Sequence, residues 1–335
     1  MNEATPLRDA GLADDHWKRF YTAAEVEEIA STASTTMLVS GNYPIHLRLF
    51  ARSPALPTVI MAHPMLPYGL LLARLQLPFY RAGFNVVQWD LPGWGQSGGP
   101  RAGCPIADFI RAWHDVISFC EQRFSGLLYG MGLAEDSVTC YYVGANNPKL
   151  RAISLHTLHE YGDPDGVHWQ GPPWLVRLKS VGVALGVKLR PTASVPADKA
   201  LPWRSIFSGP DDGPLLQAFR LDPLRVRRFE FVLAASMTRR MPAPVPLEAC
   251  RTPVQVIASE LSSLWPYAMN VRYFQRLGGP KELVTLAGVD QWVYTLAFFE
   301  TYAAHVIRWF KANGAEVHEP AAAVPAAAHR SEGDA

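Results

Sequence analysis

The chain has 335 residues, of which 49% are hydrophobic, and its 31 basic and 30 acidic side chains give a formal net charge of +1. This composition is typical of a globular protein with a sizeable core. No long run of like charge occurs, so no nucleic-acid partner is expected and nothing points to an anionic membrane. The four cysteines show no metal-binding or redox spacing, so reduced, buried thiols are expected.

The two ends of the chain differ from its middle. Residues 1–33 are predicted to form a polar N-terminal arm with one short helix at residues 21–30, and nothing there resembles a signal peptide. Residues 315–335 are rich in alanine and proline, which predicts a disordered tail. No apolar run reaches the roughly 18 residues of a membrane span. A cytoplasmic protein is therefore expected.

Between these ends, short apolar runs typical of strands alternate with helical patterns. The expected strands are residues 35–39, 45–50, 58–64, 84–90, 126–132, 150–158, 254–260 and 282–288, and the expected helices are residues 70–81, 106–123, 133–146, 267–277 and 294–311. From the third strand onward the alternation predicts an α/β fold with a mostly parallel, doubly wound sheet. The first two strands flank the turn sequence SGNYP, which predicts an antiparallel pair at one edge.

One segment, residues 160–248, interrupts this alternation and is too long for a connecting loop. It is rich in proline and tryptophan and contains the helix-like pieces WLVRLKSVGVALGV and PLRVRRFEFVLAASMTRR, the second at residues 223–240. We expect it to form a helical cap over the carboxyl ends of the strands, where open α/β sheets bind ligands. The core then comprises residues 34–159 and 249–314. The neutral charge balance and ten tryptophans favour a small apolar molecule as the ligand under the cap.

Two motifs carry a resemblance to a known family. His63-Pro64 follows the third expected strand, and the stretch Asp90-Leu91-Pro92-Gly93-Trp94-Gly95-Gln96-Ser97 follows the fourth. They resemble the His-Gly turn and the D-x-x-G-x-G-x-S turn of the α/β-hydrolase superfamily, and the resemblance covers residues 35–313. The second motif is structural, because its glycines permit tight backbone geometry. The resemblance implies a sheet of the α/β-hydrolase type with an inserted helical cap.

The family carries its nucleophilic serine in G-x-S-x-G, on a strained turn between strand and helix called the nucleophile elbow. Here the strand GLLY leads into Gly130-Met131-Gly132-Leu133-Ala134, which places Gly132 where the family has serine. Glycine readily adopts strained backbone, so the turn can persist without its chemistry. Ser137 and Cys140 lie about one and two helical turns farther on, which takes them away from the tip of the elbow.

The other two members of the triad are also missing from their expected places. After the strand at residues 254–260, Ser262 or Ser263 holds the position of the acid, with Glu260 slightly early. After the last strand, Gln291, or alternatively Asp290, stands where the family has histidine. Catalysis by Ser-His-acid needs all three groups. The resemblance therefore implies a degenerate triad, and ordinary ester or amide hydrolysis is not expected.

Polar groups at the predicted strand ends supply the remaining candidate site. The candidates for catalysis are His63, Glu135, His156 and His159, and those for binding are Met131, Gly132, Leu133, Glu260, Asp290, Gln291 and Trp292. Backbone N–H groups around Leu133 are candidates for an oxyanion hole. Each histidine has an alternative interpretation as a hydrogen-bonded structural residue, and Glu135 as favourable charge in the first turn of a helix. No metal site and no cofactor are predicted.

Three functions stay open at this point. The preferred one is an enzyme that has lost the serine triad and acts on a small apolar substrate by acid/base or electrostatic catalysis, as a lyase, isomerase, cyclase or decarboxylase. The second is an inactive pseudoenzyme that serves as a ligand-binding or protein-interaction module. The third is an atypical hydrolase in which water is activated directly. A homo-oligomer is an open alternative for the oligomeric state.

Overall fold

The computed structural model describes residues 5–6, 17–164, 166, 171–190, 192–200, 212–290 and 296–317. Its strands are β1 (Thr5–Pro6), β2 (Ala33–Ser40), β3 (Tyr43–Phe50), β4 (Thr58–Met61), β5 (Asn85–Trp89), β6 (Leu128–Leu133), β7 (Leu150–His156), β8 (Ser194–Pro196), β9 (Arg228–Glu230), β10 (Val254–Ser259) and β11 (Lys281–Leu286). Its helices are α2 (Ala23–Thr32), α3 (Ala73–Arg81), α4 (Ile106–Arg123), α5 (Glu135–Gly144), α6 (Pro173–Leu189), α7 (Ala197–Ala200), α9 (Asp212–Leu221), α10 (Phe231–Thr238), α11 (Tyr267–Arg276) and α12 (Leu296–Ala312). Every strand and helix expected from the sequence outside residues 160–248 is present, with ends shifted by a few residues.

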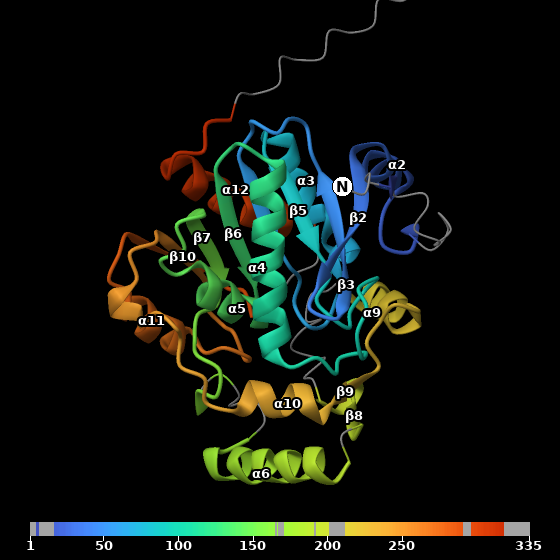
Figure 1. Ribbon diagram of the computed structural model, residues 1–335, viewed down its shortest axis with the longest axis vertical. Helices are drawn as coiled ribbons and strands as arrows, with labels where there is room; N and C mark the ends of the chain where they lie inside the picture. Colours follow the sequence, from blue (N-terminus) through green and yellow to red (C-terminus); the bar gives the residue numbers. More distant parts are fainter. Residues whose placement is uncertain are drawn as a thin grey trace, which may run out of the picture.

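A nine-stranded sheet runs through the centre of the molecule in the order β1-β2-β3-β5-β4-β6-β7-β10-β11 (Figure 1). Neighbours from β5 to β11 pair in parallel, whereas β1, β2, β3 and β5 pair antiparallel at one edge. The predicted mostly parallel sheet with an antiparallel edge is therefore confirmed. The order also places β4 and β6 side by side in the middle of the sheet, so the loops that follow them lie next to each other.

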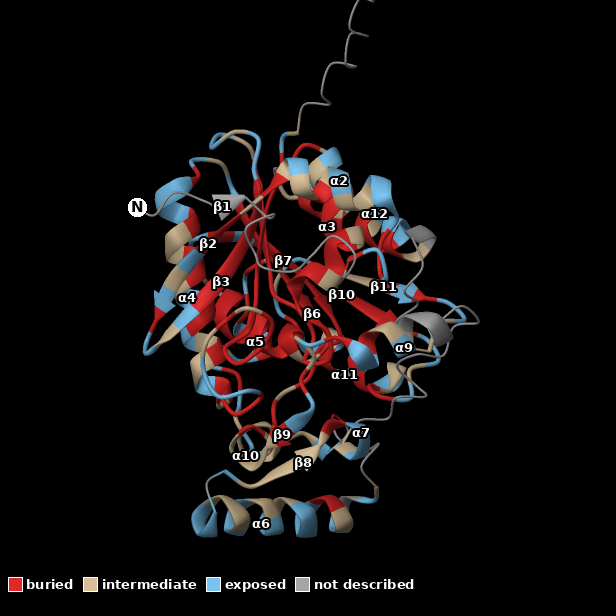
Figure 2. Cartoon of the chain, turned by 90° about the vertical axis from the view of Figure 1, so that its right-hand side faces the viewer, coloured by how far each residue is buried: buried red, intermediate tan, exposed pale blue. Residues whose placement is uncertain are grey.

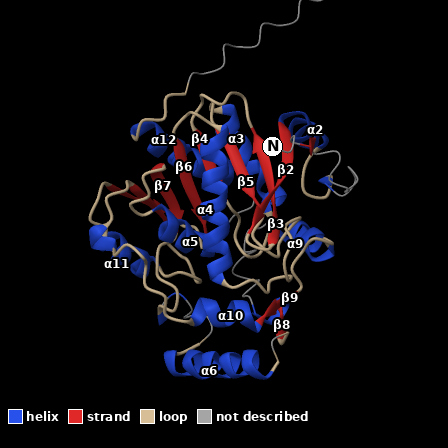
Figure 3. Cartoon of the chain, in the orientation of Figure 1, coloured by secondary structure: helices blue, strands red, loops and turns tan. Residues whose placement is uncertain are grey.

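Helices cover both faces of this sheet (Figure 3). The pair α4 and α5 packs on one face, and the pair α3 and α12 packs on the other. Strands buried on both faces need apolar side chains throughout. Every residue of β4, β5, β6 and β10 is buried, and Figure 2 shows β6 and β10 in red. This double cover explains why these strands appear in the sequence as apolar runs rather than alternating patterns.

The segment between β7 and β10 lies at the carboxyl ends of the parallel strands (Figure 1). Its described part holds α6 and α10, which pack together, and a short antiparallel pair of β8 with β9. The predicted helix-like piece at residues 223–240 is helical only from Phe231 onward, because Arg228–Glu230 pairs with Ser194–Pro196 instead. We call residues 160–248 the inserted segment.

The N-terminal arm packs against the core. Its helix begins at Ala23, two residues later than expected, because Thr22 and Glu25 form a capping box there. The side chains of Trp17, Phe20 and Tyr21 are buried, and Glu25 pairs with Arg74 of α3 at 2.7 Å. Of the predicted tail, residues 318–335 lie outside the described part of the chain. Within the described part, no helix combines the length and apolar character that crossing a membrane requires.

Candidate functional site

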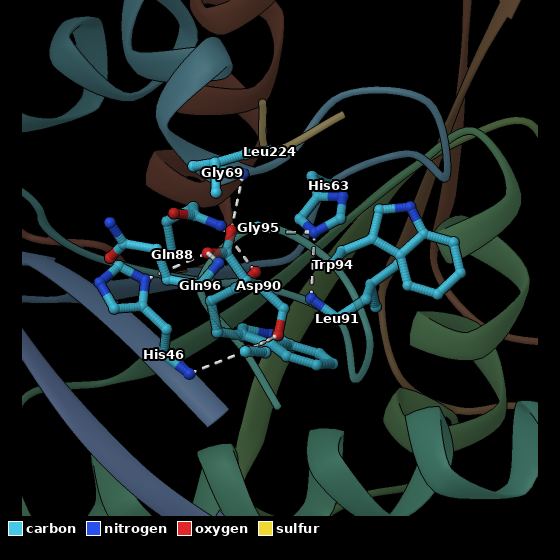
Figure 4. A network of polar contacts seen from close by, with 12 residues as sticks. His46, His63, Gly69, Gln88, Asp90, Leu91, Trp94, Gly95, Gln96 and Leu224 are labelled. Atoms are coloured by element: carbon cyan, nitrogen blue, oxygen red, sulfur yellow. Dashed lines mark hydrogen bonds and ion pairs between the residues drawn. The ribbon is translucent and has the colours of Figure 1, made fainter. Parts of the chain in front are cut away.

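The turn after β5 is organised by one buried carboxylate, that of Asp90 (Figure 4). It accepts hydrogen bonds from the backbone N–H groups of Gly69 at 2.8 Å and Gln96 at 3.0 Å, and from the His46 ring at 3.1 Å. Burial opposes its ionisation, but the hydrogen bond from His46 and the surrounding positive charge outweigh burial, so the pKa of Asp90 lies below its usual value. The carboxylate thus ties the turn to β3 and to the segment before α3, which agrees with the structural role inferred for this motif.

His63 belongs to the same network. Its Nδ1 lies 2.7 Å from the backbone oxygen of Pro64, and its Nε2 accepts the Leu91 N–H at 3.0 Å. This pattern requires the neutral tautomer with the proton on Nδ1. Burial lowers the pKa of His63, which favours the same neutral form. Because both ring nitrogens are engaged with backbone, the structure places His63 as a turn histidine.

The nucleophile elbow lies at Ala134, not at Gly132. Ala134 has φ +53° and ψ −126° and stands between the end of β6 and the first residue of α5. Such backbone is strained for any residue with a Cβ. Gly132 is still within β6, where it pairs with Leu155 of β7, and its φ is not positive. The predicted placement of the elbow at Gly132 is therefore wrong by two residues.

The correct frame of the motif is Gly132-Leu133-Ala134-Glu135-Asp136. A Cβ at position 132 would lie 2.5 Å from the Ser137 Cα and 2.7 Å from the Cys140 Cβ, so only glycine lets α5 pack this closely on β6. This is the role of the first glycine in G-x-S-x-G. The sequence obscured the frame because Asp136, a charged residue, occupies the position of the second glycine. At the corrected position the chain carries alanine, which has no nucleophilic atom.

Two backbone N–H groups at the elbow face the carboxylate of Glu135. In the family, the oxyanion hole is formed by the N–H of the residue after the nucleophile and by an N–H from the loop after the strand corresponding to β4. Here these residues are Glu135 and Met65, whereas the sequence pointed to Leu133. The Glu135 side chain accepts the Met65 N–H at 3.4 Å and also its own N–H. Burial nevertheless dominates and raises the pKa of Glu135.

Glu135 is one of the residues that line a cavity of about 140 Å³. Met65 and Glu135 lie at the core side, and His159, Tyr161 and Trp265 lie at the flank. The side of the inserted segment comprises Lys179, Ser180 and Val183 of α6, Leu233, Ala234, Met237 and Thr238 of α10, and Val195, Ala200 and Phe229. The lining is mostly apolar, so the cavity suits a small apolar molecule with few polar atoms.

His159 is the second titratable candidate beside this cavity. Its ring stacks on Trp265 with a centroid separation of 6.4 Å, and its Nδ1 has no hydrogen-bond partner among the described residues. Burial lowers the pKa of His159 to about 4, outweighing the opposite effect of Asp163. The ring is therefore neutral at physiological pH. Tyr161, which the sequence analysis missed, donates its hydroxyl to the Glu135 backbone oxygen at 3.2 Å.

Several other candidates do not line this cavity. The His156 ring packs edge-on against Tyr302 at 5.8 Å, and its Nε2 lies 3.5 Å from the Ser259 hydroxyl. Burial lowers the pKa of His156 to about 3. Met131 and Leu133 are buried β6 residues within the core. The structure thus brings Glu135 and His159 together around the cavity and leaves His156, Met131 and Leu133 in the core.

The loops after β10 and β11 meet where the family's acid and histidine would meet. The Ser263 N–H and hydroxyl donate to Asp290 at 2.8 and 3.0 Å, and Glu260 accepts the Gly288 N–H at 2.8 Å. These contacts join the two loops at the surface. Gln291 and Trp292 lie outside the described residues. Among the residues that the structure does describe, no group of three His, Cys, Asp or Glu side chains is placed to hold a metal ion.

Asp136 is a buried carboxylic acid beside the elbow. Its Oδ1 accepts the Trp113 indole N–H at 2.8 Å, but burial raises the pKa of Asp136 well above its usual value. A raised pKa means that folding is most favoured when the group is protonated, and that stability falls as pH rises above 3.8.

We expect Asp136→Asn to unfold at a higher urea concentration than the native chain at pH 8. The difference should shrink toward pH 4, and a constant difference would contradict the assignment.

No family model and no curated protein matches the sequence. Solved structures match the fold. A monoacylglycerol lipase of Paleococcus ferrophilus superposes with a TM-score of 0.62 at 19% identity, over 80% of this chain and 99% of that chain. An α/β hydrolase of Penicillium sp. sh18 gives 0.66 at 17% identity, over 84% and 98%. A hypothetical protein of Pseudomonas aeruginosa gives 0.65 at 12% identity, over 92% and 99%. The chain therefore has the α/β-hydrolase fold.

Proposed function

We propose that this protein is an enzyme that has replaced the serine mechanism with proton transfer by Glu135, acting on a small, largely apolar substrate under a helical cap formed by the inserted segment. The observation that carries the proposal is the position of the Glu135 carboxyl group, at the base of an apolar cavity and on the two elbow N–H groups. Alanine at the elbow supports the loss of covalent catalysis.

Glu135 and His159 have the opposed properties of an acid and a base. Burial raises the pKa of the glutamic acid and lowers that of the histidine, so a protonated carboxyl and a neutral imidazole can be present at the same pH. The carboxyl group can donate its proton to a substrate oxygen, and the resulting carboxylate is stabilised by the N–H groups of Met65 and Glu135. The apolar walls exclude water that would compete for the proton. These features suit a lyase, isomerase or cyclase reaction.

The substrate can be sought among small molecules that copurify with the protein. We expect mass spectrometry to find a ligand with the native chain and to lose it with Ala234→Phe, which fills the cavity from α10. Ala235→Phe is the matched control, because Ala235 neighbours Ala234 on the same helix and does not line the cavity. Ligand retained by Ala234→Phe, with both variants folded by circular dichroism, would rule out this cavity as the binding site.

Replacing Glu135 tests the chemistry itself. Glu135→Gln keeps the shape of the side chain but removes its titratable proton. We expect kcat for conversion of the copurified ligand to fall by about 100-fold or more, with KM changed by less than about threefold. Glu160→Gln is the control, because Glu160 lines the same cavity while its carboxylate accepts the Ala243 N–H at 3.0 Å. Full turnover by Glu135→Gln would refute the proposal.

A ligand-binding module is the second candidate, and one observation favours it. The Glu135 side chain already occupies the N–H groups on which an oxyanion would form. Incubation of the native protein with its copurified ligand separates the two functions, because a binding module returns the ligand unchanged. An ester-hydrolysis assay addresses the third alternative, direct activation of water, and we expect no activity in it.

A further inference from the structure

Helix α6 carries a row of exposed apolar side chains along its outer face. Trp174, Leu178, Val181, Leu185 and Leu189 are between 54% and 86% exposed. Their spacing of three or four residues places them on one side of the helix, at about 3.6 residues per turn. We call these five residues the outer stripe.

Packing among the residues that the structure describes does not account for the outer stripe. The inner side of α6 contacts α10, and Ser180 and Val183 on that side line the cavity. Figures 1 and 2 show α6 as the outermost element at the end of the molecule formed by the inserted segment. A helix that is apolar on its outer face as well as its inner one is characteristic of a binding surface.

The charges on α6 are all of one sign. Arg177, Lys179 and Lys188 lie within the helix and Arg190 stands at its C-cap, whereas no Asp or Glu occurs between residues 172 and 190. Arg177 and Lys188 fall on the same flank of the outer stripe by helical spacing. A second copy of the chain docked through this face would bring these like charges together. Anionic headgroups would instead pair with them while the apolar side chains enter the lipid.

We propose that the outer stripe of α6 docks on an anionic lipid surface. A tryptophan and four aliphatic side chains with basic residues beside them match the composition of helices that lie in the membrane interface. The sequence has no long run of like charge, so this local group of basic side chains did not stand out in it. Since the inner side of α6 covers the cavity, docking would present the cavity to molecules dissolved in lipid. This last point rests on the proposed function, whereas docking itself does not.

Flotation with lipid vesicles tests the proposal on the full-length protein. We expect the native chain to float with vesicles of phosphatidylcholine mixed with phosphatidylserine, to bind phosphatidylcholine alone more weakly, and to lose binding progressively as salt is raised. The double variant Leu178→Glu and Leu185→Glu should lower the partition coefficient by at least about tenfold. Leu261→Glu is the matched control, because Leu261 is 60% exposed, close to the 62% of Leu178, and lies outside α6.

The outcomes separate the alternatives. Absence of flotation by the native chain would overturn the proposal, and so would equal flotation of the double variant, given that both are folded by circular dichroism. A dimer in light scattering that the double variant abolishes, without vesicle binding by the native chain, would assign the face to a second copy and also overturn it. Glu135→Gln should float like the native chain, so a failure of the proposed chemistry would leave the docking result intact.

Discussion

Replacing Gly132 with serine, the change that would restore the family motif in the frame read from the sequence, is expected to destabilise the fold by about 3 kcal/mol. The added Cβ would lie 2.5 Å from the Ser137 Cα, which is backbone and cannot rotate away. Either β6 or α5 must therefore shift, and both are buried. Urea unfolding followed by circular dichroism measures the loss.

Ala134→Ser is the matched variant. Position 134 already holds a Cβ in the strained conformation, so we expect a change in unfolding free energy within about 0.5 kcal/mol. This variant should also stay inactive on esters, because the sequence carries Gln291, or alternatively Asp290, where a serine mechanism needs its histidine base. A tolerated Gly132→Ser together with a disruptive Ala134→Ser would show that the elbow lies at Gly132 after all.

Replacing Asp90 with alanine is expected to cost about 3–5 kcal/mol of folding free energy. The change leaves the N–H groups of Gly69 and Gln96 without their hydrogen-bond acceptor and removes the hydrogen-bond partner of His46. Urea unfolding at neutral pH is the measurement. Asp108→Ala is the control, because its carboxylate pairs with the half-exposed Arg111 and should contribute less than about 1 kcal/mol.

The contribution of Asp90 to the free energy of unfolding also depends on pH. Its pKa is lower in the folded chain than the unfolded value of 3.8, so its contribution to stability is complete above that value and is lost as pH falls below it. The difference between the native chain and Asp90→Ala should therefore narrow on acidification. A difference that stays constant from neutral pH to pH 3 would mean that ionised Asp90 is not what holds the turn.

The sequence predicted the sheet and most helices because apolar runs and helical periodicity are properties of neighbouring residues. Helix α4 was predicted at residues 106–123, where the structure has it. The elbow was misplaced because small residues at every second position, Gly130, Gly132 and Ala134, satisfy the motif in two frames. Only the backbone angles distinguish the frames, and these follow from where β6 stops pairing with β7.

Side-chain partners were less predictable still. His63 and His156 looked equivalent to His159, since all three follow strands in the sequence. In the structure, His63 accepts the Leu91 N–H and the His156 ring packs against the Tyr302 ring, and these contacts distinguish both histidines from His159. These contacts join residues far apart in the chain, so no local pattern could have indicated them. The contact between Glu135 and Met65 likewise depends on β4 lying next to β6.

The Glu135 carboxylate competes with any ligand for the backbone N–H groups of Met65 and Glu135. Because Glu135 is attached to one of the N–H groups that its side chain accepts, it acts there at the effective concentration of an intramolecular ligand. Any incoming oxygen must displace it, and an ionised competitor is harder to displace than a protonated one. Free carboxylates and phosphates are thus poor ligands for this pair of N–H groups. At lower pH the Glu135 carboxylate becomes protonated and binds these N–H groups more weakly, so neutral carbonyl and hydroxyl compounds can displace it more easily.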